Sequence, residues 1–254
     1  MRHILVTGGA TGIGAGVSRA LVGAGHAVTL TFRHSAAEAE ALRVELTRAG
    51  GPPVRAVALD LADKVALDAF CKDVDRFDGD GFGPVDGLVH NAGQSYDTLS
   101  MMLDQTRAEA AMQVNFWSLT QLVGALARPM MARRFGRFMA IGSVTAERSN
   151  QGNAAYGASK AAVHAYMRTL AIETAKRGVT ANVIAPGFVD TAMMAKYASH
   201  RAGMEKQIPA GRFAQADEIG ALAAFLVGDS AGYITGATIP VDGGLSASMG
   251  LQRG

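Results

Sequence analysis

Cysteine is almost absent from this sequence, since Cys71 is the only one among 254 residues. An internal disulfide is therefore excluded, which suits the reducing cytosol. Long hydrophobic runs are absent as well, because polar or charged residues interrupt the apolar stretches well before the ~18 positions that a membrane span requires. The apolar run at residues 4–6 is far too short for the core of a secretory signal. We expect a cytoplasmic protein without a membrane span.

A strong excess of either charge is also missing. The formal net charge is +2 and the basic residues form no long run, which gives little support to nucleic-acid binding. The chain has instead 49% hydrophobic content, enough for one large core. Its 31 glycines and 7 prolines are spread along the chain, as turn residues are. No linker, repeat or change in composition divides the sequence, so we expect residues 1–254 to form one domain.

Short apolar runs alternate with longer helical patterns along the chain. Runs typical of strands occupy residues 4–6, 28–32, 54–59, 86–89, 137–141, 180–184 and 238–241. Helical spacing occupies residues 14–23, 36–49, 64–77, 109–133, 156–176 and 216–227. Apolar strands without strict alternation are typical of sheets covered on both faces, and repeated strand–helix units imply parallel strands with right-handed crossovers. The sequence predicts an α/β fold with a single Rossmann-like, doubly wound parallel sheet.

Glycines gather between the first predicted strand and the first predicted helix. The segment is Thr7-Gly8-Gly9-Ala10-Thr11-Gly12-Ile13-Gly14. Glycines there let the chain turn tightly and let a phosphate approach the backbone N–H groups, and the helix start adds a partial positive charge. The spacing differs from the general dinucleotide fingerprint, so a glycine-rich turn without a ligand is the alternative. The flanking strand and helix favour nucleotide binding.

The end of the second predicted strand bears on the choice of nucleotide. In dinucleotide-binding folds, an acidic residue at this place hydrogen-bonds the adenosine ribose and repels a 2′-phosphate. Here Phe32 takes that place and the cation Arg33 follows it. A guanidinium can form paired, charge-assisted hydrogen bonds with a phosphate. The sequence therefore favours NADP(H) over NAD(H), although a solvated surface arginine is the alternative for Arg33.

Tyr156 and Lys160 lie four residues apart on a predicted helix, so their side chains share one face. A tyrosine hydroxyl titrates near ~10 when unperturbed, and a nearby ammonium would bring that pKa closer to neutrality. Ser143 follows the fifth predicted strand, at the edge where ligands bind in open α/β sheets. Its hydroxyl could hold a substrate carbonyl oxygen while Tyr156 supplies the proton. The Tyr–Lys spacing alone is a weak signal, because it also arises by chance.

The combination of motifs is far more specific. In chain order the pieces are Thr7-Gly8-x-x-x-Gly12-Ile13-Gly14, Asp60-Leu61, Asn91-Ala92-Gly93, Asn115, Ser143, Tyr156-x-x-x-Lys160, Pro186-Gly187 and Thr191. With these pieces the chain resembles the short-chain dehydrogenase/reductases over essentially its whole length. One residue departs from the pattern, since His90 stands where the family usually has another asparagine. We interpret His90 as a strand-end histidine that is hydrogen-bonded locally, outside the proton path.

The resemblance implies a role for each piece. It makes Tyr156 the general acid in reduction and Ser143 the residue that orients the carbonyl. It implies that Lys160 lowers the pKa of Tyr156 and holds the nicotinamide ribose, and that Asn115 helps to hold a water continuing the proton relay. The residues expected to contact NADPH are Gly8, Thr11, Gly12, Ile13, Gly14, Arg33, Asp60, Leu61, Asn91, Ala92, Gly93, Tyr156, Lys160, Pro186, Gly187, Val189 and Thr191. No metal is expected.

Within the family, the chain most resembles 3-oxoacyl-acyl-carrier-protein reductases of fatty-acid synthesis. The segments that carry this resemblance are Asp97, Met101-Met102 and residues 130–137, 177–182, 233–236 and 241–244, while residues 150–156 look most like copies that serve polyene-type acyl chains. The resemblance implies NADPH-dependent reduction of a 3-oxoacyl thioester on acyl-carrier protein. A reductase of a free small ketone or alcohol is the alternative. A nucleotide-binding sensor without turnover is a third interpretation, against which the presence of both Tyr156 and Lys160 argues.

The resemblance also implies two kinds of partner. Arg134 and Arg177 fall where the reductases of fatty-acid synthesis present cations to an acidic carrier protein at the mouth of the active site. The alternative is that the charge of each arginine only stabilises the C-terminus of the helix that it follows. The family further suggests a homotetramer built on the helices that carry Asn115 and Tyr156 and on the C-terminal segment. The candidate contact residues are Phe116, Trp117 and Tyr166, for which ordinary core packing is an equal explanation.

Overall fold

The computed structural model describes residues 1–47, 50–74, 79 and 81–248. Its strands are β1 (His3–Thr7), β2 (Ala27–Phe32), β3 (Val54–Ala58), β4 (Val85–His90), β5 (Gly136–Ile141), β6 (Val179–Pro186) and β7 (Thr238–Val241). They pair in parallel in the order β3-β2-β1-β4-β5-β6-β7. The predicted parallel sheet is confirmed, and each strand lies within about two residues of its predicted bounds.

The helices follow the predicted pattern with two additions. They are α1 (Gly12–Gly23), α2 (Ala36–Leu46), α3 (Lys64–Asp73), α4 (Gln105–Met112), α5 (Ser118–Arg133), α6 (Ala154–Thr174), α7 (Arg201–Glu205) and α8 (Ala216–Val227). The predicted helices 36–49 and 64–77 reach residues 48–49 and 75–77, which lie outside the described residues. The sequence did not predict the 3₁₀ segment η6 (Ala192–His200) or α7. Within the described part of the chain, no helix is long and apolar enough to cross a bilayer.

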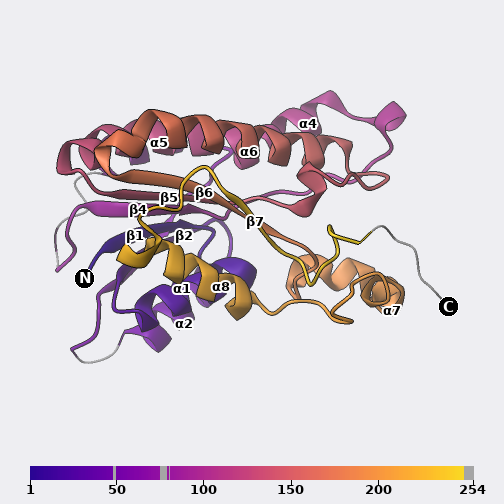
Figure 1. Cartoon of the computed structure of the whole chain (residues 1–254), viewed down its shortest axis with the longest axis horizontal. Helices are drawn as coiled ribbons and strands as arrows, with labels where there is room; N and C mark the ends of the chain where they lie inside the picture. Colours follow the sequence, from indigo (N-terminus) through magenta and orange to yellow (C-terminus); the bar gives the residue numbers. More distant parts are fainter. Residues whose placement is uncertain (48–49, 75–78, 80, 249–254) are drawn as a thin grey trace.

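Helices cover both faces of the sheet (Figure 1): α4, α5 and α6 lie on one face, and α1, α2 and α8 on the other. Successive strand residues point to opposite faces, so β4 sends Leu88 into one core and Val89 into the other. Leu88 packs in a cluster with Leu122 of α5, whereas Val89 belongs to a cluster with Ile219 of α8. This double burial explains why the strands are continuous apolar runs.

The chain order of the strands reverses beside β1, which lies between β2 and β4. In open parallel sheets, the crevice at the carboxyl ends of the strands on either side of such a reversal is the usual ligand site. The segment that contains η6 and α7 follows β6 and lies beyond the carboxyl ends, at the right of Figure 1. The fold therefore directs attention to the ends of β1, β2, β4, β5 and β6.

Candidate active site

The turn between β1 and α1 forms one side of this crevice. Gly8 and Gly12 have φ angles of 60° and 52°, in the left-handed region that favours glycine. A Cβ on Gly14 would overlap the carbonyl oxygen of Gly8, so the first turn of α1 packs directly on the glycine turn. Thr11, the residue before α1, makes no side-chain capping hydrogen bond. The turn thus presents bare backbone and the N-terminus of α1, with Ile13 partly buried behind it.

The segment after β4 forms the opposite side and is hydrogen-bonded to the turn. The amide nitrogen Nδ2 of Asn91 donates to the carbonyl oxygens of Thr7 (3.1 Å) and Gly8 (2.9 Å). The Thr7 hydroxyl accepts from the backbone N–H groups of Asn91 and Ala92, both at 3.1 Å. Asn91 and Ala92 therefore hold the crevice in shape through their own polar groups. Next to them, a Cβ on Gly93 would lie 3.5 Å from Lys160 Nζ, so this segment lies against the lysine.

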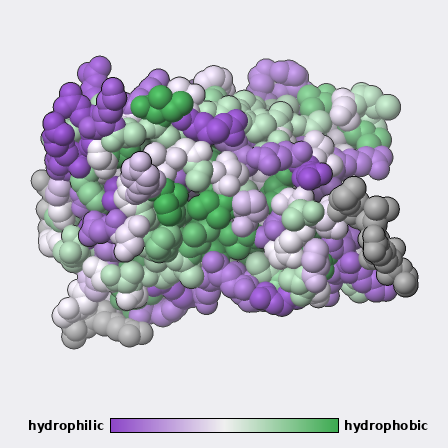
Figure 2. Space-filling view, viewed as in Figure 1, coloured by the Kyte–Doolittle hydropathy of each residue, from purple (hydrophilic) through white to green (hydrophobic). Residues whose placement is uncertain are grey.

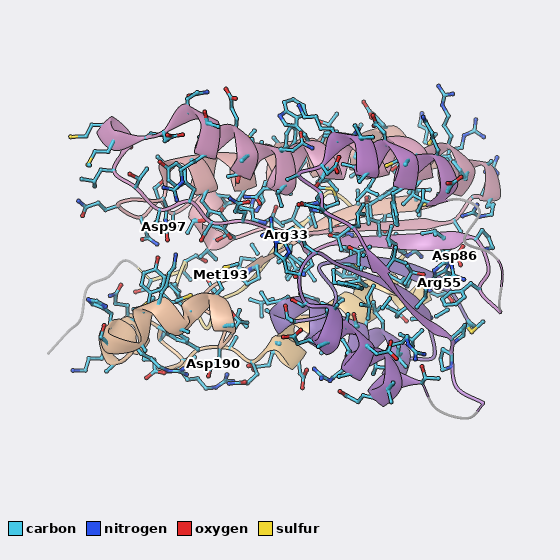
Figure 3. The ribbon with its side chains drawn as sticks, turned by 180° about the vertical axis from the view of Figure 1, so that it is seen from behind. Arg33, Arg55, Asp86, Asp97, Asp190 and Met193 are labelled. Carbon is cyan, nitrogen blue, oxygen red and sulfur yellow. The ribbon has the colours of Figure 1, made fainter. Side chains whose placement is uncertain are left out.

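Arg33 lies at the carboxyl end of β2 and is exposed. Figure 3 shows it in the middle of the molecule, between Asp97 and Met193 toward one end and Asp86 toward the other. Asp60 and Leu61 follow the neighbouring β3; the Asp60 carboxylate accepts the N–H of Ala62 (2.9 Å), and Leu61 is buried. The structure thus brings these predicted cofactor residues to the same edge of the sheet as the glycine turn.

Residues 186–191 continue β6 across the crevice. Pro186 ends the strand, and Gly187 donates its N–H to the carbonyl of Val241 (3.1 Å). Val189 is buried and pairs with Ala214 in an isolated bridge. A Cβ on Gly12 would lie 3.3 Å from Thr191 Cγ2, so Thr191 lies against the glycine turn. The three predicted cofactor segments, from β1, β4 and β6, therefore meet at one place.

Lys160 and Tyr156 lie beside this crevice on α6. Lys160 is only 3% exposed, its Nζ donates to the carbonyl of Ile141 (2.7 Å), and burial lowers its pKa to about 8. Nζ lies 5.7 Å from the centroid of the Tyr156 ring. Burial, together with the nearby Asp97 carboxylate, raises the pKa of Tyr156, and the hydrogen bond with Ser143 only partly opposes this. The Lys160 ammonium donates to the Ile141 carbonyl and, with a pKa of about 8, is mostly charged at neutral pH, so its effect on the Tyr156 pKa stays a prediction.

Ser143 comes directly after β5 and is buried. Its Oγ accepts hydrogen bonds from the hydroxyl of Thr145 (2.8 Å) and from the Thr145 backbone N–H (3.2 Å). These two contacts fix the oxygen at the start of the 3₁₀ turn η4 (Val144–Ala146) and leave its own proton to donate. Ser143 can therefore hydrogen-bond either Tyr156 or a substrate carbonyl. Thr145 belongs to no motif of the sequence, because its role depends on the geometry of the local turn.

Asn115 lies in the π-helical segment η3 (Gln113–Trp117), which separates α4 from α5 within the helix predicted at 109–133. Its Nδ2 donates to the carbonyl of Gln94 (3.0 Å) and to Ser159 Oγ (2.8 Å), and its Oδ1 accepts the N–H of Gln94 (2.7 Å). Ser159 in turn donates to the carbonyl of Tyr156 (2.7 Å). The Asn115 amide therefore ties the segment after β4 to the start of α6. π-helical turns of this kind are frequent at functional sites.

His90 ends β4 and is almost fully buried, directly behind this π-helical segment. Its Nε2 lies 2.8 Å from Ser118 Oγ, and Ser118 donates its hydroxyl to the carbonyl of Val114 (2.7 Å). Because the Ser118 proton is used in that bond, we assign the proton of His90 to Nε2, as the donor. The local hydrogen bonding predicted for His90 is confirmed, and it supports the segment that carries Asn115.

This environment predicts an acid-sensitive fold. Burial and, to a lesser degree, the charge of Lys160 lower the pKa of His90 to about 3, from 6.5. Below pH 6.5 the unfolded chain binds a proton at this position and the folded chain does not. The free energy of unfolding therefore decreases as the pH is lowered. At pH 5 the loss from His90 amounts to about 2 kcal/mol. Melting temperatures from pH 7 to 5 should fall less steeply for His90→Asn than for the wild type.

The control for this experiment is His34→Asn, at an exposed histidine. It should keep the slope of the wild type. Since His90→Asn can change stability at every pH, only the difference in slope carries the prediction. An unchanged slope in His90→Asn would show that His90 takes up its proton in the folded state.

Asp97 is a further residue of the site, which the sequence singled out only for its resemblance to the reductases. Its carboxylate accepts hydrogen bonds from Asn153 Nδ2 (2.8 Å) and the Tyr197 hydroxyl (2.7 Å), and it forms an ion pair with Lys196. Asp97 follows β4, Asn153 precedes α6, and Lys196 and Tyr197 belong to η6. One carboxylate thus joins the three segments around the site, and Figure 3 shows Asp97 and Met193 of η6 at the same end of the molecule.

Arg134 and Arg177 lie elsewhere. Both are exposed, and each lies two residues before a strand, Arg134 before β5 and Arg177 before β6, at the amino edge of the sheet. A Cβ on Gly178 would overlap the carbonyl of Arg134, so the two arginines are neighbours. The six residues of β5 separate this edge from Ser143, a span of about 20 Å. The expectation that they flank the mouth of this chain's own site does not match their position, because a residue just before a parallel strand lies at the edge opposite the ligand.

The whole arrangement has counterparts among known proteins. A family model described as enoyl-(acyl carrier protein) reductase matches residues 8–246. A 3-oxoacyl-[acyl-carrier-protein] reductase of Haemophilus influenzae is 38% identical over 96% of this chain and 98% of its own length. An acetoacetyl-CoA reductase of Allochromatium vinosum is 38% identical over the same shares. A crystal structure of a candidate NAD(P)-dependent gluconate 5-dehydrogenase from Beutenbergia cavernae, with NADP bound at low occupancy, has a TM-score of 0.90 and 33% identity over 97% of each chain.

Proposed function

The chain belongs to the short-chain dehydrogenase/reductase family, and on that basis we propose that it reduces 3-oxoacyl thioesters on acyl-carrier protein to 3-hydroxyacyl thioesters with NADPH. One observation carries the proposal. Ser143, Tyr156 and Lys160 lie together at the carboxyl edge of the sheet, beside the crevice that the glycine turn borders. Similarity to 3-oxoacyl-acyl-carrier-protein reductases along almost the whole chain supports this substrate class. We further propose that residues 1–254 act as one domain.

The residues of the crevice fit NADPH. Gly8 and Gly12 have positive φ angles, so the turn before α1 presents backbone without side chains, as a pyrophosphate lying on it requires. Arg33 is exposed at the end of β2, where it would bind the 2′-phosphate. Lys160 would hold the nicotinamide ribose, and Thr191 would contact the nicotinamide end. When bound, NADPH supplies the hydride that is added to the carbonyl carbon.

The protein supplies the proton and fixes the carbonyl. Ser143 donates a hydrogen bond to the carbonyl oxygen, and Tyr156 transfers its phenolic proton to the same oxygen, so that the ketone becomes an alcohol. The Tyr156 phenol is protonated at neutral pH, as a general acid must be, but burial raises its pKa, so release of the proton depends on groups that stabilise the phenolate. The Lys160 ammonium, whose pKa is about 8, stabilises the phenolate that remains. Asn115 positions the start of α6 through Ser159, and we propose that it also helps to hold a water of the proton relay.

The test is an NADPH-oxidation assay with acetoacetyl-carrier protein beside acetoacetyl-CoA and a panel of free ketones. Carrier-bound reduction with the highest kcat/KM is expected. Turnover of free ketones together with inactivity on both thioesters would instead establish the small-ketone alternative. The acetoacetyl-CoA arm matters because one relative at 38% identity is an acetoacetyl-CoA reductase.

We also propose a homotetramer. On the α5–α6 face, Phe116 lies 4.7 Å from Trp117 and 5.9 Å from Tyr166 between ring centroids, and Trp117 is 51% exposed. Figure 2 shows hydrophobic surface in the middle of a second face, where Figure 1 has α8 and β7. Phe225 of α8 is about half exposed. Two such faces on one chain would allow two kinds of subunit contact, as a tetramer with dihedral symmetry needs.

The position of Arg134 and Arg177 is then compatible with carrier-protein docking. A two-fold axis across the α5–α6 face pairs helices in antiparallel fashion, which brings the amino edge of one subunit toward the carboxyl edge of the next. We propose that the two arginines of one subunit bind an acidic carrier protein that serves the site of a neighbouring subunit. Electrostatic steering of this kind weakens as salt screens the charges.

Charge reversal tests the docking proposal. Arg134→Glu with Arg177→Glu should raise KM for acetoacetyl-carrier protein about tenfold or more at low salt, and less at high salt. KM for a small acetoacetyl thioester should not change. The matched control is Lys64→Glu with Lys72→Glu, on exposed positions of α3, which should leave both substrates unaffected. Equal losses for carrier-bound and small substrates, with a lower melting temperature, would mean that the arginines only stabilise their helix ends.

A further inference from the structure

His164 is a buried histidine that the reduction chemistry described above does not use. It lies on α6, four residues after Lys160 and therefore on the same helix face, and is 2% exposed. A Cβ on Gly142 would overlap its Nε2, so the imidazole packs directly against the residue that precedes Ser143. Lys160 bonds the carbonyl of Ile141 just before it. The two side chains thus support adjacent peptides at the end of β5.

Both ring nitrogens of His164 lack a partner at hydrogen-bonding distance among the described residues. Such a buried polar group destabilises the folded state, whereas an apolar side chain of similar shape would not. Packing alone therefore does not explain why this residue is a histidine. A side chain that moves to hydrogen-bonding distance of the ring would explain it.

A carboxylate lies just beyond bonding distance, since Glu147 Oε1 is 3.9 Å from His164 Nδ1. Glu147 is rigidly connected to Ser143, because the η4 turn is closed by hydrogen bonds from Ala146 to Ser143 and from Glu147 to Val144, both 3.1 Å. The Glu147 side chain is otherwise mostly exposed. A shift of about 1 Å in the exposed Glu147 side chain would close the gap to normal hydrogen-bond length and would link His164 to the turn that carries Ser143.

We propose that His164 and Glu147 form a hydrogen-bonded pair that holds Ser143 on the substrate carbonyl, which makes His164 a positioning residue for the reduction. The neutral imidazole donates from Nδ1 to the Glu147 carboxylate, and the pair links the Ser143 turn to the helix of Tyr156 and Lys160. The inference rests on the proposed ketone reduction. It assigns to His164 no contact with substrate or cofactor.

Protonation of His164 would disturb this arrangement. Burial lowers its pKa; the charges facing it are Glu147, which attracts a proton, and Lys160 and Arg168, which repel it. At neutral pH the ring is therefore uncharged and can donate to Glu147. In acid, a protonated His164 would be a second cation beside Lys160 at the end of β5, and this repulsion would disturb the position of Ser143. We therefore expect kcat to fall on the acidic side of its pH profile.

Leucine and asparagine at position 164 separate positioning from packing. His164→Leu fills the site without a donor, whereas the amide nitrogen of His164→Asn can take the place of Nδ1. We expect His164→Leu to lower kcat about tenfold to hundredfold, the value of a hydrogen bond to a charged group, with the KM for NADPH unchanged and the melting temperature equal or higher. His164→Asn should recover most of kcat and lack this fall of kcat in acid. Met167→Leu, a buried neighbour on α6, is the control and should match the wild type.

Glu147→Ala should lower kcat by a similar factor, and its combination with His164→Leu should be no worse than His164→Leu alone. Wild-type kcat in His164→Leu, or His164→Asn no better than His164→Leu, would overturn the proposal. If His164→Leu does not fold, the asparagine and Glu147→Ala variants decide alone, since a normal kcat for Glu147→Ala also contradicts the pair. Activity of the wild type on acetoacetyl-carrier protein tests the proposed function. The ratio of variant kcat to wild-type kcat, measured on whichever ketone the wild type reduces, tests the His164–Glu147 pair.

Discussion

Tyr156→Phe is expected to lower kcat by ~10²–10⁴ while NADPH binding stays near that of the wild type. The phenyl ring keeps the packing of the tyrosine ring beside Lys160, so the cofactor crevice keeps its shape. What disappears is the phenolic proton that Ser143 helps to aim at the carbonyl oxygen. Lys160→Ala should differ by weakening NADPH binding as well, because the ammonium is assigned two roles.

The measurement is kcat with saturating NADPH and ketone, together with the Kd for NADPH from quenching of protein fluorescence. Tyr166→Phe is the matched control, since Tyr166 lies on the same helix and contacts Phe116 instead of the site. It should keep wild-type kcat. A Tyr156→Phe enzyme with more than half of the wild-type kcat would remove Tyr156 from its role as the acid.

The sheet could be predicted because its signal is local. Residues such as Leu88 and Val89 point to opposite cores, so both must be apolar, and the strand stands out as a continuous run. The glycine turn was equally visible, because overlap of a Gly14 side chain with Gly8 excludes larger residues there. Motif order then placed Ser143, Tyr156 and Lys160, and the structure brings them together.

What the sequence did not show depends on contacts between distant segments. Helical spacing runs unbroken through 109–133. The π-helical break is accompanied by hydrogen bonds to distant segments, such as those of Asn115 with Gln94 and of Ser118 with His90. A four-residue spacing placed Lys160 and Tyr156 on one helix face, but it did not show that the Lys160 ammonium also donates to the carbonyl of Ile141 on another element. The contacts of Asp97 with Lys196 and Tyr197 span about a hundred residues of sequence and carry no motif.

The edge occupied by Arg134 could have been recognised from the sequence. A residue just ahead of a parallel strand lies at the amino edge, and Arg134 lies two residues before a strand that was correctly predicted. Proximity along the chain to the helix of Asn115 gave the opposite impression, because that helix runs back across the sheet to its far edge. The same topological reasoning supports Arg33, which follows its strand and so lies at the ligand edge.

Arg33→Ala is accordingly expected to lower kcat/KM for NADPH about tenfold to hundredfold and to leave kcat/KM for NADH almost unchanged. Only NADPH carries the 2′-phosphate, and Arg33 is an exposed cation at the end of β2 with Phe32 where an acid would repel that phosphate. Arg33→Lys should fall between, because an ammonium keeps the charge but cannot form the paired hydrogen bonds of a guanidinium.

Kinetics with both cofactors, for the wild type and each variant, measure the effect. Arg43→Ala is the control: Arg43 is an arginine of α2 that pairs with Glu40, and its loss should change neither cofactor's kcat/KM. Raising the salt concentration should weaken NADPH use by the wild type more than by Arg33→Ala, since screening acts on the charge that the variant lacks. Equal use of NADPH and NADH by the wild type would mean that Arg33 is only a solvated surface residue, and that Phe32 and Arg33 do not select the cofactor.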